Sequence, residues 1–260
     1  MEKGITQFIE QDYPEYSLFL SDSGPPENEG IASGVLERVI GAHPSLEGRV
    51  HYRYIAQSSG PLSRGEAMNL GTSETESDIV LFLHIDCKLP NGALHSIAQA
   101  WRNGVKGGGF LKEYTGKAIW SPLQATERYL NWVRTVVTRQ VVGTNAIFLD
   151  RQLAVEHPYE GNFLEDVELS DWMKERLTRH EFQIIRDYVG VSAQKYTKHG
   201  EVSAIAINAS VMLLYRLFST SPDLLRTRLY RRKFSKGWKF WPELLGTTWS
   251  LILGKGNHDN

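Results

Sequence analysis

Polar residues suited to metal or acid–base chemistry follow an unbroken apolar run near the first third of the chain. The run 79–83 leads directly into His84 and Asp86. Five apolar residues without alternation predict a strand buried on both faces, and open α/β sheets bind ligands beyond the carboxyl ends of such strands. An imidazole and a carboxylate at that place can hold a divalent cation. In a simpler interpretation, Asp86 caps the helix after Pro90 and His84 packs against it.

Carboxylates stand at two further positions of the same kind. Asp22 follows a predicted strand at 17–21, whereas Glu165 and Asp166 open a predicted helix at 164–177. If the strands are parallel, their carboxyl ends share one edge, so we expect the three groups to gather there. Mg²⁺ or Mn²⁺ needs few protein ligands when a diphosphate supplies the others. Asp166 or Glu165 could then be a general base for an acceptor hydroxyl. Alternatively, both acids only complement the helix dipole.

The elements that must position these groups alternate between strand and helix. The order β-α-β-α with short connections predicts an α/β fold, a mostly parallel sheet flanked by helices on both faces. We expect a catalytic domain over 1–200 and a helical, basic and aromatic extension over 201–260, divided near Gly200. The predicted strands cover 17–21, 50–56, 79–83, 145–149 and 182–186; the predicted helices cover 3–11, 31–40, 64–72, 91–102 and 164–177, with a long amphipathic segment at 122–140.

Composition limits the classes of protein that remain. The chain has 260 residues and a net charge of -1, which argues against nonspecific binding to nucleic acid. Its single cysteine, Cys87, excludes an internal disulfide framework and fits a reducing compartment such as the cytoplasm. A buried bystander is the favoured interpretation of Cys87, with a nucleophile as the alternative. Residues 1–11 do not resemble a signal peptide, and 204–218 is too short to span a bilayer.

The carboxyl-terminal tail mixes basic and aromatic residues. Seven basic residues between 226 and 239 interleave with Trp238, and Phe240, Trp241 and Trp249 follow. Such a mixture suits anionic lipid headgroups, so a peripheral membrane surface is one expected partner. The alternative is that the aromatic residues pack the tail onto the core.

Six segments match, in order, the motifs of a known family. They are Q-D-Y-P-E-Y-S-L-F-L-S-D-S-G (11–24), S-R-G-E-A-M-N-L-G (63–71), L-F-L-H-I-D-C-K-L-P (81–90), G-G-G-F (107–110), V-G-T-N-A-I-F-L-D-R (142–151) and F-L-E-D-V-E-L-S (163–170). The tail segment S-P-D-L-L-R-T-R-L-Y-R-R (221–232) is also similar. Over about residues 5–232 the chain resembles family 2 glycosyltransferases of the GT-A fold. It is most similar to a small subgroup described as arsenosugar-biosynthesis-like transferases.

The resemblance implies a GT-A-like, Rossmann-related fold and a metal-dependent reaction. A sugar would pass from a UDP- or GDP-sugar to an acceptor hydroxyl, with inversion, and Mn²⁺ or Mg²⁺ would be the cofactor. In the matched motifs His84 takes the place of the first Asp of D-x-D. The implied roles are nucleotide binding by Asp22, Arg64, Asn69 and Asp86, metal binding by Asp86 and His84, and catalysis by Asp166 as the base beside Glu165. For Arg64 alone, a solvated helix residue is the alternative.

The chain departs from the family pattern in three places. Family members begin with a strand of the type S-V-I-I-P-T-x-N-E, which we expect to be absent because the chain starts after it. The turn after Asp22 lacks the serine and second aspartate of D-G-G-S-x-D-G-T, and Gly143-Thr144-Asn145 replaces G-D-Q. A second hypothesis is therefore a catalytically degenerate or truncated relative that acts as a binding or scaffold subunit. A dinucleotide-binding oxidoreductase is disfavoured because no G-x-G-x-x-G follows a first strand.

Overall fold

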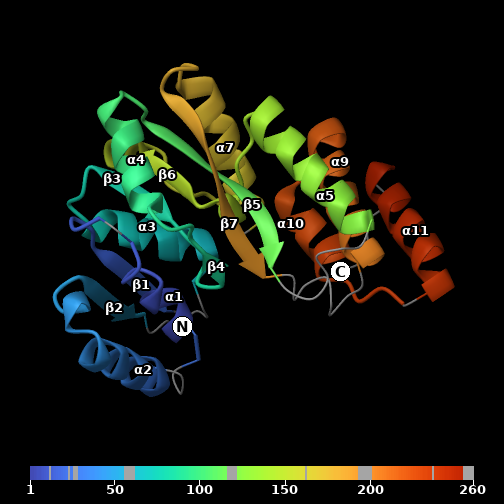
Figure 1. Cartoon of the computed structure of the whole chain (residues 1–260). Coiled ribbons are helices and arrows are strands. Elements are labelled where there is room, and N and C mark those ends of the chain that lie inside the picture. Colours follow the sequence, from blue (N-terminus) through green and yellow to red (C-terminus); the bar gives the residue numbers. More distant parts are fainter. Residues whose placement is uncertain are drawn as a thin grey trace. The chain divides into compact units, whose positions relative to one another are not determined.

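A computed structural model of the chain divides into two compact units (Figure 1). It describes residues 1–11, 13–22, 24–25, 29–55, 62–115, 122–161, 163–192, 201–235 and 237–253. Unit 1 comprises 1–115, 128–161 and 165–192, and unit 2 comprises 116–127, 162–164 and 193–260. The predicted division near Gly200 and the predicted strand end at residue 56 lie outside the described residues.

A five-stranded mixed sheet forms the centre of unit 1. In spatial order its strands are β3 (Ile79–Phe82), β6 (Ile147–Asp150), β5 (Gly107–Thr115), β7 (Phe182–Ser192) and β4 (Cys87–Lys88). Strands β5 and β7 run parallel, whereas β3 with β6, β6 with β5, and β7 with β4 are antiparallel. The prediction of a mostly parallel sheet is therefore wrong. An apolar run indicates burial but carries no direction, and β6 lies between β3 and β5 in the opposite sense to both.

Strand β5 is absent from the predicted set because three consecutive glycines disfavour a strand. The structure explains why glycine is required there. A Cβ atom on Gly108 would lie 1.9 Å from the carbonyl oxygen of Gln183, and one on Gly107 would lie 2.9 Å from the Leu149 side chain. The three glycines thus let β5 approach its neighbours more closely than any side chain would allow.

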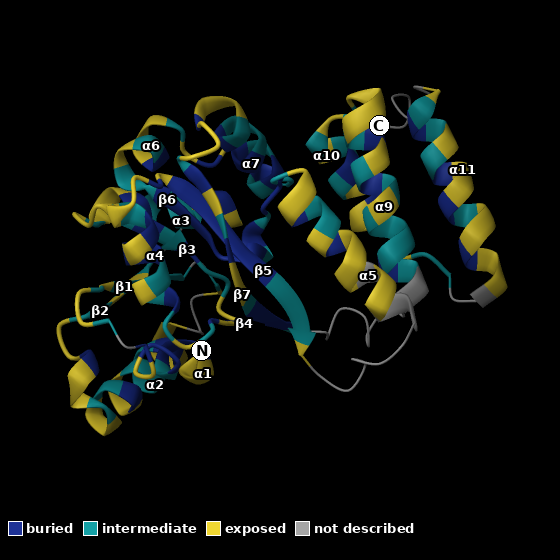
Figure 2. Ribbon diagram, turned by 45° about the horizontal axis from the view of Figure 1, so that its top comes forward, coloured by how far each residue is buried: buried dark blue, intermediate teal, exposed yellow. Residues whose placement is uncertain are grey.

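Helices cover both faces of the sheet, whose central strands are buried (Figure 2). Helix α4 (Ala93–Arg102) packs Ile97 onto one face, where Phe148 of β6 also points. Helices α3 (Arg64–Glu74), α6 (Arg151–Glu156) and α7 (Glu165–Arg176) cover the other face, where Leu149 of β6 meets Met173. Alternate residues of β3 enter the two clusters, which confirms the expected strand buried on both faces.

A smaller parallel sheet of β1 (Leu18–Asp22) and β2 (Val50–Tyr54) carries the amino-terminal part of unit 1. Helices α1 (Glu2–Thr6) and α2 (Glu29–Ala42) and the short helix η2 (Pro44–Leu46) pack against it through Ile5, Val39 and Leu46. Helix α3 also contacts β1. This small sheet therefore supports the first of the predicted acids, Asp22, at the end of β1.

Unit 2 is helical and has its own core. It contains α9 (Glu201–Phe218), α10 (Pro222–Leu225), η5 (Arg226–Tyr230), η6 (Gly237–Lys239) and α11 (Phe240–Ile252). Buried Leu214, Leu225, Leu229, Phe240 and Leu244 hold these helices together. None of the described helices is both long enough and apolar enough to cross a membrane.

Most predicted elements are present, with shifted bounds. The helix expected at 3–11 is shorter, because α1 ends at Thr6 and turns follow it. The strand expected at 182–186 is only the first half of β7. The amphipathic segment 122–140 forms α5 (Pro122–Trp132) followed by the π-helix η3 (Val133–Val137). The two-residue strand β4, like β5, has no counterpart in the prediction.

Candidate active site

Arg64 connects helix α3 to the first residues of helix α7. The position of Arg64 is fixed by a capping box, in which Ser63 and Glu66 exchange hydrogen bonds at the start of α3. Its Nε atom donates to Glu165 Oε1 at 2.7 Å, and Nη2 lies 2.6 Å from the same oxygen. Nη2 also lies 3.4 Å from Asp166 Oδ2. One guanidinium therefore contacts both predicted catalytic carboxylates.

His84 completes this cluster from the end of β3. Arg64 Nη1 lies 3.0 Å from His84 Nε2. Arginine can only donate, so Nε2 must be the acceptor and the proton of the neutral ring is assigned to Nδ1. Burial lowers the pKa of His84 below its ordinary 6.5, and the Arg64 charge lowers it further, against the opposing influence of Asp166 and Asp86. The imidazole is thus kept neutral by its surroundings.

Gly143, in the short helix η4 (Gly143–Asn145), brings His84 and Asp166 to one place. Its backbone N–H donates to Asp166 Oδ2 at 2.7 Å. A Cβ atom at this position would lie 2.6 Å from His84 Nε2 and 3.2 Å from Asp166 Oδ2. Only glycine lets the backbone donor approach both side chains this closely.

Arg64 and the two carboxylates that it contacts differ in how far they are buried. Burial alone would lower the pKa of Arg64, but the carboxylates of Asp166 and Glu165 outweigh it and leave the pKa raised above its ordinary value. Glu165 is almost wholly buried, with a side chain 4% exposed, whereas the Arg64 side chain is 40% exposed. Glu165 therefore depends on Arg64 for its neutralisation, and the ion pair contradicts a merely solvated Arg64. Both acids also stand in the first turn of α7, where the helix dipole favours them.

Tyr159 and Asn69 form the support behind the cluster. The Asn69 side chain donates to the Tyr159 carbonyl at 2.9 Å and accepts from its backbone N–H at 2.8 Å. Gly65 packs closely there, since a Cβ would lie 2.9 Å from Tyr159 Cβ. The buried Tyr159 hydroxyl has no hydrogen-bond partner among the described residues. Burial and the charge of Asp166 raise its pKa well above 10.0, so it stays protonated.

Asp22 lies in a different setting, on the two-stranded sheet. Its Oδ1 accepts from the Gly24 backbone N–H at 2.8 Å, and its Oδ2 accepts from the Tyr52 hydroxyl at 3.1 Å. Burial and the hydrogen bond to Asp22 raise the pKa of Tyr52 to about 12. Within the described ranges, no hydrogen bond or ion pair joins Asp22 to the Arg64 cluster.

Asp86 is exposed, two residues beyond His84. It does not cap the following helix, because the N-cap of α4 is Gly92 with no side-chain cap, so the simpler interpretation of Asp86 is wrong. No described residue forms a hydrogen bond or ion pair with its carboxylate, whose oxygens suit a hard cation. In the parts of the chain that the structure describes, no three His, Cys, Asp or Glu side chains converge as a metal site.

These residues fit one kind of cation site. Mg²⁺ and Mn²⁺ are commonly held by one or two carboxylates together with substrate phosphates, and Asp86 could serve in that way. His84 fits less well, because its Nε2 lone pair is engaged by Arg64. It could join through Nε2 only after Arg64 withdrew.

Cys87 is buried beneath this segment and behaves as a structural residue. Burial and the neighbouring Asp86 raise the pKa of its thiol to about 12, so the reactive thiolate is strongly disfavoured at neutral pH. Its carbonyl accepts from Gln7 Nε2 at 3.1 Å, which ties β4 to the amino-terminal turns. The bystander interpretation is thus the one that the geometry supports.

Of the predicted site residues, the structure brings together Arg64, His84, Glu165 and Asp166. Asp86 stands beside His84, Asn69 supports the cluster from behind, and Asp22 lies apart. Sequence reasoning missed Gly143 and Tyr159 as members of the site. Gly143 lies in a matched segment, but that segment was considered only for the acid that Thr144 replaces. Nothing in the sequence marks Tyr159.

The fold is similar to that of known glycosyltransferases. No protein-family model matches the sequence, and no curated protein matches it. The structure resembles the mannosyltransferase PcManGT from Pyrobaculum calidifontis, solved with GDP-Man and Mn²⁺, with a TM-score of 0.57 at 14% identity over 100% of this chain and 72% of that one. It also resembles S. aureus TarS 1–349 in complex with UDP, with a TM-score of 0.54 at 14% identity over 96% of this chain and 76% of that one. The chain therefore has an α/β fold with a mixed sheet like that of GT-A glycosyltransferases.

Proposed function

We propose that the chain transfers a sugar from a nucleoside-diphosphate sugar to an acceptor hydroxyl, with inversion at the sugar carbon. The observation that carries the proposal is the meeting of Arg64, His84, Glu165 and Asp166 on a fold like that of PcManGT. The donor would be a UDP- or GDP-sugar, since the similar structures hold UDP or GDP-Man.

Asp166 is the proposed base. Its Oδ2 is fixed by the Gly143 N–H and by Arg64, while no described residue hydrogen-bonds to Oδ1. Oδ1 can accept the proton of an acceptor hydroxyl as that oxygen attacks the sugar carbon. Glu165 has a different task, because it is buried and orients Arg64.

The remaining residues would bind the nucleotide and its phosphates. Asp22 would accept hydrogen bonds from the base, Arg64 would face the diphosphate, and Asn69 would hold the Tyr159 segment against the nucleotide. Asp86, assisted by His84, would hold Mn²⁺ or Mg²⁺. When bound, such a cation neutralises the charge that develops on the leaving diphosphate.

A second candidate is a nucleotide-binding subunit that does not turn over. The contact that favours it is Arg64 Nη1 on His84 Nε2, because it occupies the lone pair that a metal ligand would need. In that case phosphates would be held by arginine without a cation.

Isothermal titration with UDP and GDP distinguishes these candidates. The transferase predicts heat with one nucleotide in Mn²⁺ and a large loss of affinity in EDTA or in Asp86→Ala. Equal affinity with and without Mn²⁺ would favour the second candidate. No heat from either nucleotide, in a folded sample, contradicts both.

Asp166→Asn tests the chemical step separately. The asparagine oxygen can still accept from the Gly143 N–H, so we expect nucleotide affinity to be kept while the rate of nucleotide release from the donor sugar falls roughly 100-fold or more. Glu175→Gln is the matched control, because Glu175 is an exposed acid on the same helix. Equal rates in the two variants would remove Asp166 from its role.

A further inference from the structure

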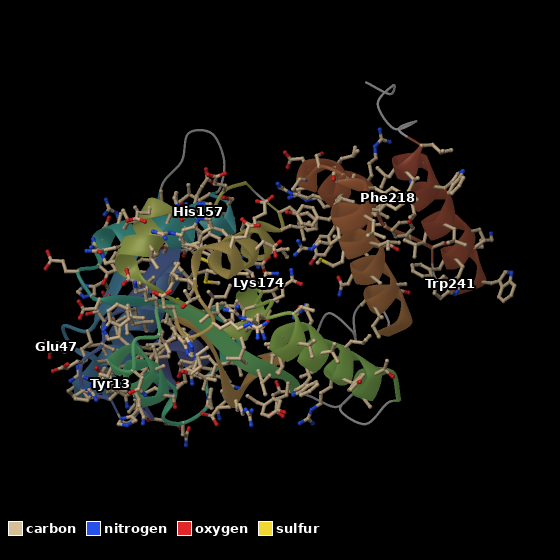
Figure 3. The ribbon with its side chains drawn as sticks, turned by 90° about the horizontal axis from the view of Figure 1, so that it is seen from above. Tyr13, Glu47, His157, Lys174, Phe218 and Trp241 are labelled. Atoms are coloured by element: carbon tan, nitrogen blue, oxygen red, sulfur yellow. The ribbon has the colours of Figure 1, made fainter. Side chains whose placement is uncertain are left out.

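Helix α11 is apolar on two sides. One side packs Phe240, Leu244 and Leu251 into the core of unit 2. The other exposes Trp241, Leu245 and Trp249, which are spaced by four residues and are 45%, 63% and 61% exposed. Trp241 is labelled in Figure 3. No charged residue is among the exposed positions of this helix. Phe240 packs within the core of unit 2 itself, whereas Trp241 and Trp249 are not covered by that core.

Trp238 is a further exposed aromatic residue next to this helix in the chain. It stands in η6, immediately before α11, and is 91% exposed. A tryptophan ring pairs a large apolar surface with one polar N–H, and such side chains favour membrane–water interfaces. Three exposed tryptophans within twelve residues therefore suit a partner that is apolar inside and polar at its surface.

A basic segment lies directly against this helix. Arg232 Nη1 donates to Thr247 Oγ1 of α11 at 2.9 Å, and the Ser235 N–H donates to Glu243 Oε2 at 2.7 Å. Residues 204–253 contain eight basic and two acidic residues, although the whole chain has a net charge of -1. Exposed Lys239 also stands between Trp238 and Trp241 in the chain, so positive charge adjoins the exposed tryptophans at the start of the helix.

We propose that this surface, made of α11, Trp238, Lys239 and the basic residues of 226–235, binds anionic lipid bilayers. The helix would lie in the plane of the interface, with Trp241, Leu245 and Trp249 among the headgroups and the first acyl carbons. Lysine and arginine beside it would contact the lipid phosphates. A second copy of the chain fits poorly, because an isologous contact would bring two basic segments together.

Flotation of the full chain with vesicles tests the proposal. We expect flotation with phosphatidylcholine vesicles that contain phosphatidylglycerol, little with phosphatidylcholine alone, and loss of binding when salt is raised to about 0.5 M. The triple variant Trp241→Ser, Leu245→Ser, Trp249→Ser should bind about tenfold less tightly or worse. The charge reversal Arg231→Glu with Lys233→Glu should do the same, and it supplies an independent result if the triple variant misfolds.

Two controls match these changes outside the surface. Ile31→Ser removes an exposed apolar side chain of α2, and Arg38→Glu reverses an exposed charge of the same helix. Both should float as the wild type does. The proposal fails if the wild type stays out of the vesicle fraction at low salt, or if both surface variants float normally. A dimer that the triple variant abolishes, or binding to an acidic protein in place of vesicles, would equally overturn it.

Discussion

Two regions of unit 1 hold predicted acids in contrasting ways. Asp22 is bound by neutral donors, the Tyr52 hydroxyl and the Gly24 N–H, and none of the described residues forms an ion pair with it. Glu165 and Asp166 share the cation of Arg64, which joins two helices in doing so. The first arrangement leaves a charged acceptor at the end of a strand, whereas the second makes the fold depend on an ion pair. Each of the following changes tests that difference.

Arg64→Ala should have the largest effect on stability. It leaves Glu165 buried without a cation, and breaking a buried pair costs several kcal/mol. Because the Arg64 side chain is 40% exposed, solvent reduces that cost, and we expect a loss of about 2–3 kcal/mol in urea unfolding. Asp22→Asn should cost about 1 kcal/mol, since it changes only hydrogen bonds to neutral donors.

The double variant Arg64→Ala with Glu165→Gln separates the two contributions to this loss. If the unpaired carboxylate is responsible, the second change should restore part of the stability. A loss in Arg64→Ala no greater than that in Asp22→Asn would contradict the contrast between the two regions.

The residues of the candidate cluster could be predicted from the sequence, but most of their contacts could not. Arg64, His84, Glu165 and Asp166 each stood at a predicted helix start or strand end, which is information that local patterns carry. The contacts of Arg64 with His84 and Glu165 join residues that are 20 and 101 positions apart in the chain, and no local pattern encodes such contacts. The grouping of Asp22 with the others was expected from one shared sheet edge, but β1 belongs to a separate sheet.

The fold shows the same limit. Apolar runs correctly located β3 and β6, because burial on both faces determines their composition. Their antiparallel pairing is a tertiary property, and so is the close approach that turns Gly107, Gly108 and Gly109 into a strand. The exposed tryptophans of α11 are a further case, since an apolar residue in the sequence does not reveal whether its side chain is covered.

Acid should weaken the Arg64 cluster through His84. Its pKa in the folded chain lies below the ordinary 6.5, so between those two values the unfolded chain binds more protons than the folded one. This contribution to stability is complete above pH 6.5 and is lost as the pH falls through the folded pKa. We expect part of the acid destabilisation seen in the wild type to disappear in His84→Gln. The control is His95→Gln, which changes an exposed histidine of α4. Its free energy of unfolding should depend on pH as that of the wild type does. If the free energy of unfolding depends on pH in the same way in both variants, His84 is not the titrating group.

Tyr52→Phe should cost less than Arg64→Ala and tests the Asp22 region alone. It removes one hydrogen bond to a carboxylate, for an expected loss of about 1.5 kcal/mol in urea unfolding. The folded pKa of about 12 lies above the ordinary 10.0, so the stabilisation from this bond is complete below pH 10 and is lost as the pH rises through 12. Because the pKa of Tyr159 is also raised, absorbance of tyrosinate should show one late-ionising group fewer in Tyr52→Phe than in the wild type. If the variant removes a group that ionises near pH 10 instead, the Tyr52 hydroxyl is not bound to Asp22, and neutral donors do not hold that acid.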